Sequence, residues 1–103
     1  MTLSGKQRRH LRALGHGLAP VTQIGKGGVS DAVVAAVDEA LAHHELVKVK
    51  LLETLELDRD AAAELLAART QAAIAQVLGR TILLYRADPD EPRILLPRSA
   101  SAS

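Results

Sequence analysis

The sequence predicts a single α/β domain, because helical and strand-like patterns alternate along a chain of 103 residues. Segments with apolar residues at three- and four-residue spacing are separated by short runs rich in Val, Ile and Leu. The core must be aliphatic, since Tyr85 is the only aromatic residue. The sequence has no cysteine, which excludes disulfides, thiolate zinc sites and a cysteine nucleophile.

The first two elements are a basic helix and a short strand. Ser4 and Gln7 have the spacing of a capping box, which predicts a helix over about residues 5–15 that ends at glycines. A β-branched run then predicts a strand over residues 21–24.

A second helix and a second strand follow. Ser30 can cap a helix that runs to His43 or His44. Residues 46–53 alternate in the manner of a strand, with Lys48 and Lys50 on one face.

The last third contains a third helix and two or three strands. Asp58 or Asp60 can cap an alanine-rich helix over residues 61–69. Residues 70–78 are ambiguous, because helix propensity favours a longer helix whereas the residues before Gly79 permit a strand.

The end of the chain contains one clear strand and one weaker candidate. Residues 81–86 form a nearly continuous apolar run, which is typical of a buried strand. Residues 93–96 are a candidate edge strand. We expect the domain to end at residue 97 and residues 98–103 to form a disordered tail.

The segment Gly25-Lys26-Gly27-Gly28 is a GxxG motif between the first strand and the second helix. Glycine allows a partner's backbone to come close, and a helix N-terminus offers unpaired N–H groups to an anion. The motif lacks the spacing of a P-loop and no catalytic pair is evident, so we expect phosphate binding without nucleotide hydrolysis.

Charge is unevenly distributed although the net charge is only +1. Residues 1–30 contain five Lys and Arg side chains and no acidic residue, which predicts a basic patch for a polyanion. His43, His44 and Glu45 are a poor metal site, because adjacent helical residues point in different directions and no further ligand is evident. We expect no metal and no cofactor. No apolar run is long enough to span a membrane, and we expect a cytoplasmic monomer.

Several segments together resemble the CRM domain family, named for chloroplast RNA splicing and ribosome maturation, in its free-standing bacterial YhbY-like form. The matching segments are residues 3–8, 11–12, 24–28, 39–50, 76–81 and 84–86. The resemblance implies the element order α-β-α-β-α-β-β and a mixed four-stranded sheet, similar to the C-terminal domain of translation initiation factor three. It therefore favours a strand near residues 75–78. One departure is Gln71, where many family members have glycine.

The resemblance also implies that this protein binds RNA of the large ribosomal subunit precursor in ribosome assembly and is not an enzyme. The alternative is a module that contacts ribosomal proteins or assembly factors through residues 93–96 or the acidic middle of the chain. The candidate RNA-binding residues are Gly25, Lys26, Gly27, Gly28, Lys6, Arg8, Arg9, Arg12, Lys48, Lys50, Arg80 and Arg86.

Overall fold

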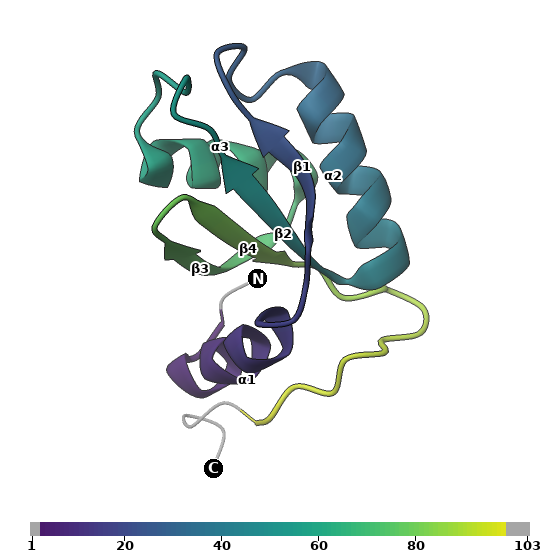
Figure 1. The fold of residues 1–103 in the computed structure, drawn as a ribbon. Helices are drawn as coiled ribbons and strands as arrows, with labels where there is room; N and C mark the ends of the chain where they lie inside the picture. The colour runs from purple at the N-terminus through teal and green to yellow at the C-terminus, as the bar shows by residue number, and fades with distance from the viewer. Residues whose placement is uncertain (1–2, 99–103) are drawn as a thin grey trace.

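The computed structural model describes residues 3–98 and contains three helices and four strands in the predicted order (Figure 1). The elements are α1 (Gly5–Gly15), β1 (Pro20–Ile24), α2 (Asp31–His44), β2 (Leu46–Leu51), α3 (Arg59–Thr70), β3 (Ala73–Leu78) and β4 (Thr81–Tyr85). Within residues 3–98, no helix is long and apolar enough to cross a membrane.

The four strands form one mixed sheet in the order β1-β2-β4-β3, which confirms the predicted sheet. β1 is parallel to β2, whereas β4 is antiparallel to both β2 and β3. Ile24 lies beside Leu51, and Lys50 lies beside Thr81. The loop after β1, the loop after β2 and the β3–β4 turn therefore meet at one end of the sheet.

α2 and α3 lie on one face of the sheet and α1 lies on the other (Figure 1), and a hydrophobic core fills each side. The larger core lies under α2 and α3 and includes Ile24, Val37, Leu66 and Leu84. The smaller core lies on the opposite face, where α1 packs. It consists of Leu3, Leu11, Leu46, Ala73, Ala75, Leu83 and Tyr85. The predicted core position of Tyr85 is confirmed, since only 2% of the residue is exposed.

Local capping determines where the helices begin. The backbone N–H of Gln7 donates to Ser4 Oγ and the Gln7 side chain accepts from the Ser4 N–H, which completes the predicted capping box. Ser30 accepts from the N–H of Val33, and Asp58 caps α3. At the end of α3, Gln71 adopts a left-handed conformation with φ of 57°, the conformation that glycine adopts without strain.

The predicted strand at residues 93–96 is wrong. The described part of the chain has its last strand at Tyr85, and the segment beyond it crosses the α1 side of the molecule without joining the sheet. Ile94 and Leu96 pack against the smaller core, and Gln7 Nε2 donates to the carbonyl of Pro97 at 3.1 Å. Most of the predicted tail, residues 99–103, lies outside the described residues.

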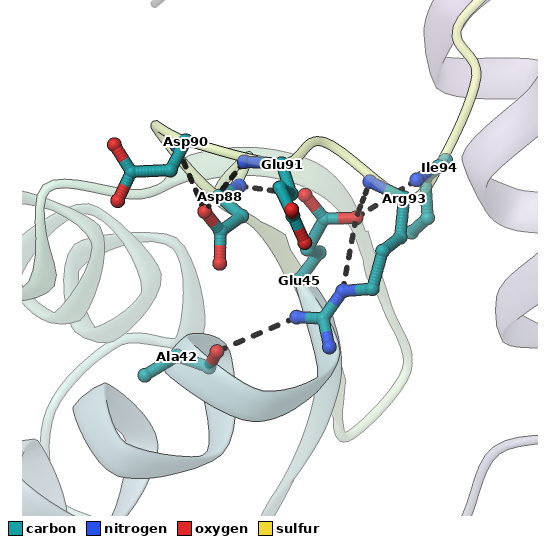
Figure 2. A network of polar contacts seen from close by, with 7 residues as sticks. All are labelled: Ala42, Glu45, Asp88, Asp90, Glu91, Arg93 and Ile94. Carbon is teal, nitrogen blue, oxygen red and sulfur yellow. Dashed lines mark hydrogen bonds and ion pairs between the residues drawn. The ribbon is translucent and has the colours of Figure 1, made fainter.

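Glu45 explains why this segment is not a strand (Figure 2). The residue is fully buried at the end of α2, and its carboxylate accepts three backbone N–H groups: from Asp88 at 2.6 Å, Arg93 at 2.9 Å and Ile94 at 2.8 Å. Burial raises the pKa of Glu45, but the bonds from Asp88, Ile94 and Arg93 outweigh it, so that the pKa lies below its ordinary value. The N–H groups that a strand would pair with a neighbour are bound to this carboxylate instead.

Candidate nucleic-acid interface

The GxxG motif forms a tight turn that we call the glycine turn, residues 25–28. The N–H of Gly28 donates to the carbonyl of Gly25 at 2.9 Å, which places Lys26 and Gly27 at the exposed tip. A side chain at Gly25 would meet Thr54 Oγ1 at 2.9 Å. Gly28 has φ of 66°, whereas the space beside Gly27 is open. Two of the glycines thus shape the turn, and Gly27 leaves its outer surface free for a partner.

The glycine turn leads directly into the N-terminus of α2. Asp31, in the first helical turn, carries a negative charge that would oppose an approaching phosphate. Arg69 of α3 offsets that charge, since its guanidinium lies 2.6 Å from Asp31 Oδ1 and also donates to the carbonyl of Val29. The sequence does not reveal this role of Arg69, because no local pattern connects two residues that are 38 positions apart.

Two further arginines lie at the same end of the sheet. Arg80 is in the β3–β4 turn, where its carbonyl accepts from the N–H of Leu51, and its side chain lies 3.5 Å from Glu53. Arg59, which was not predicted as a site residue, donates to the carbonyl of Gly79 at 3.0 Å. Both side chains are exposed, and Glu53 partly offsets the charge of Arg80 at this end of the sheet.

A second group of cations lies on the sheet face that α1 partly covers. Arg12 of α1 and Lys48 of β2, together with the His16 side chain just beyond the helix, line a cavity of about 330 Å³, which we call the α1 hollow. Lys50 is exposed two residues farther along β2 and points to the same face. The lysine pair therefore connects the α1 hollow with the end of the sheet that carries the glycine turn.

The remaining predicted residues lie elsewhere. Lys6, Arg8 and Arg9 are exposed on the N-terminal half of α1, and Arg8 lines a separate hollow with Glu64 near the start of β3. Arg86 donates to Asp38 Oδ1 at 2.6 Å and to the carbonyl of Thr70 at 2.8 Å. Its side chain thereby connects β4 to α2 and α3, and RNA contact by Arg86 stays a prediction.

The described residues contain no group of three acidic, histidine or cysteine side chains that could hold a metal ion. The rings of His43 and His44 are exposed at the end of α2, with centroids 6.2 Å apart. Both histidines lie in the last turn of α2, at the negative end of the helix dipole. The described part of the interface therefore presents basic side chains, an exposed glycine turn and hydrogen-bonding side chains.

Comparison with known proteins places these features in a family. The model of the CRS1 / YhbY (CRM) domain matches residues 3–86. The chain is 41% identical over 95 residues to the "Probable RNA-binding protein YqeI" of Bacillus subtilis, an alignment that covers 92% of this chain and 99% of the relative. It is 38% identical over 97 residues to the "RNA-binding protein" of Haemophilus influenzae, covering 94% and 97% of the two chains.

A solved structure shows the same fold. The solution structure of the hypothetical protein SAV1595 from Staphylococcus aureus matches with a TM-score of 0.80 and 38% sequence identity. The match covers 93% of this chain and 100% of that protein. Family model, relatives and fold agree, and the chain belongs to the CRS1/YhbY (CRM) domain family.

Proposed function

We propose that this protein binds RNA and grips the phosphate backbone with the glycine turn. The observation that carries the proposal is the position of Lys26 and Gly27 at an exposed tip in front of the α2 N-terminus. Backbone N–H groups and the helix dipole favour a phosphate there, and Lys26 adds a mobile positive charge. The names of the bacterial relatives support the same ligand class.

The cations on the α1 side extend the contact. Lys50, Lys48 and Arg12 continue from the end of the sheet toward α1, so that a second stretch of RNA backbone can follow them. Tyr85, the only Phe, Trp or Tyr residue, is buried, so histidine rings are the only aromatic side chains that residues 3–98 expose for base stacking. Recognition therefore depends mainly on backbone and RNA shape. We propose no chemical step, since no nucleophile and base converge at the turn.

The finer proposal is that the RNA belongs to precursors of the large ribosomal subunit and that the protein acts in ribosome assembly in the cytoplasm. This part rests on the resemblance of the chain to the bacterial members of the family. RNA crosslinking in cells, with the crosslinked positions mapped, would identify the RNA. Sedimentation of the protein with large-subunit precursors in a sucrose gradient is the expected result, and its absence from those fractions would refute the assembly role.

The direct test uses fluorescence anisotropy with a labelled transcript of large-subunit rRNA. Replacing Lys26 by alanine should weaken binding and lower the slope of log K against log salt by about 1, because one phosphate contact is lost. Arg98→Ala is the matched control, since it removes one exposed charge far from the glycine turn along the chain. Equal salt slopes for the wild type and Lys26→Ala would contradict the phosphate contact.

One observation favours a second function, namely docking to a ribosomal protein or assembly factor. Leu14, Leu18 and Val21 are exposed apolar side chains that line a cavity of about 430 Å³ beside β1. Salt-resistant binding to a purified ribosomal protein, abolished by Leu18→Asp and accompanied by no RNA crosslink, would favour this alternative.

A further inference from the structure

We propose that the α1 hollow accepts one unpaired nucleotide of the bound RNA and distinguishes its base. The inference rests on the proposed function for the origin of the ligand and adds a site that reads sequence. The cavity of about 330 Å³ lies at the lower end of the size range of small-molecule pockets, which suits one nucleotide and not a duplex.

The floor of the hollow carries hydrogen-bonding groups that a base requires. Gln76 of β3 lies opposite Leu83 of β4, and Thr81 lies opposite Leu78. All of these residues line the hollow. The carboxamide of Gln76 both donates and accepts hydrogen bonds, as the edge of a base does, and the hydroxyl of Thr81 can donate or accept one. Gln76 and Thr81 can therefore tell one base from another.

The hollow also offers apolar surface for the flat face of a base. Leu78 is 65% exposed although it lies in a strand, so the core does not account for its presence. Gly15 allows α1 to approach Leu83 closely, since a side chain at position 15 would come within 2.8 Å of Leu83 Cδ2. The close approach of α1 makes one wall of the hollow.

The charges around the hollow suit an anion. Arg12 of α1 and Lys48 of β2 both line it, and none of its lining residues is acidic. The distance along β2 from Lys48 to Leu51, where the strand ends beside the glycine turn, is about 10 Å for three residues. One RNA strand can thus contact the glycine turn and insert a nearby nucleotide into the hollow.

The test is an NMR titration of the full chain with AMP, GMP, CMP and UMP, with ribose 5-phosphate as the probe without a base. We expect one nucleotide to bind at least threefold more tightly than the others and ribose 5-phosphate to bind more weakly than any of them. The side-chain amide signal of Gln76 and the backbone signal of Thr81 should shift. Equal affinity for ribose 5-phosphate and all four nucleotides would overturn the proposal, because the cations alone would then explain binding.

Substitutions that keep the size of the side chain distinguish a loss of base recognition from an effect on folding. Gln76→Met keeps the length of the side chain but cannot exchange hydrogen bonds with a base, so the preference among nucleotides should disappear. Gln23→Met is the control, because Gln23 is exposed on β1 and does not line the hollow. Thr81→Val provides a second test if Gln76→Met fails to fold. A retained preference in the folded variants would refute the inference.

The outcomes also separate this inference from the proposed function. A salt-dependent, Lys26-dependent affinity for the rRNA transcript without nucleotide shifts at the hollow would overturn only the base-reading site. Absence of any affinity for RNA would overturn the proposed function.

Discussion

Replacing Glu45 by glutamine removes the negative charge from a carboxylate that the fold surrounds with backbone N–H groups. Oε1 accepts from Arg93 and Ile94, and Oε2 accepts from Asp88. The glutamine carbonyl can still serve the first two donors, but its NH₂ group then faces the N–H of Asp88. One charge-assisted bond is lost and two are weakened.

The expected loss of stability follows from these hydrogen bonds. Hydrogen bonds to a charged group contribute about 1.5–3 kcal/mol each, so Glu45→Gln should lower the free energy of unfolding at pH 7 by about 2–3 kcal/mol. For a domain of this size the melting temperature should fall by on the order of 10–20 °C. Thermal and urea unfolding followed by circular dichroism measure both quantities. Glu91→Gln is the matched control, because Glu91 is an exposed acid in the same segment.

The pH dependence has a definite sign. The pKa of Glu45 in the folded protein lies below its ordinary value of 4.5, so the charged carboxylate stabilises the fold above that pH. This stabilisation is lost as the pH falls through the lowered pKa of the folded state. The difference between wild type and Glu45→Gln should therefore be full at pH 7 and shrink below about pH 4.5. A difference that stays constant down to pH 3, or no difference at pH 7, would refute this reasoning.

Four further substitutions test other parts of the structure. Gly28→Ala should lower the free energy of unfolding by about 1 kcal/mol, because Gly28 has a positive φ. Gly27→Ala should leave urea unfolding unchanged and weaken RNA binding in the anisotropy assay, because the space beside Gly27 is open. The reverse pattern would contradict these roles. Gln71→Gly should raise the unfolding free energy by about 0.5–1 kcal/mol, and a loss of stability would argue against the left-handed cap. Arg86→Lys should lower the free energy of unfolding by about 1–3 kcal/mol, since lysine cannot reproduce the bonds to Asp38 and Thr70. Weaker RNA binding by the folded variant would support the predicted RNA contact of Arg86, and unchanged affinity would contradict it.

Most secondary structure could be predicted because its signals are local. Ser4, Ser30 and Asp58 cap the three helices within a few residues of their own position. The strand at Ala73–Leu78 needed the family resemblance, because alanine-rich sequence favours helix and only the pairing with β4 selects a strand.

The failed prediction has a non-local cause. Residues 93–96 have the composition of an edge strand, but Glu45 binds the N–H groups of Arg93 and Ile94 from nearly fifty positions away. No pattern within the segment reveals such a partner.

The candidate site was predicted in part. The glycine turn follows from its motif, and the structure places it at a strand-to-helix junction as expected. The grouping of the basic side chains could not be predicted, since it depends on how α1 packs on the sheet: Arg12 and Lys48 line one hollow, whereas Arg8 and Glu64 line another. The partnership of Arg69 with Asp31 likewise depends on how α2 and α3 pack.

The bonds of Glu45 also bear on how the protein is made. During synthesis the chain emerges from its N-terminus, so the α2 end is available long before its partners at positions 88, 93 and 94. Until then the Glu45 carboxylate lacks its hydrogen-bond donors, and it is more stable in water than in the protein interior. The α1 side of the sheet, where Ile94 and Leu96 pack against the smaller core, can therefore form completely only after residue 96 has been synthesised. Folding of this part of the domain thus depends on residues that are synthesised up to 49 positions after Glu45.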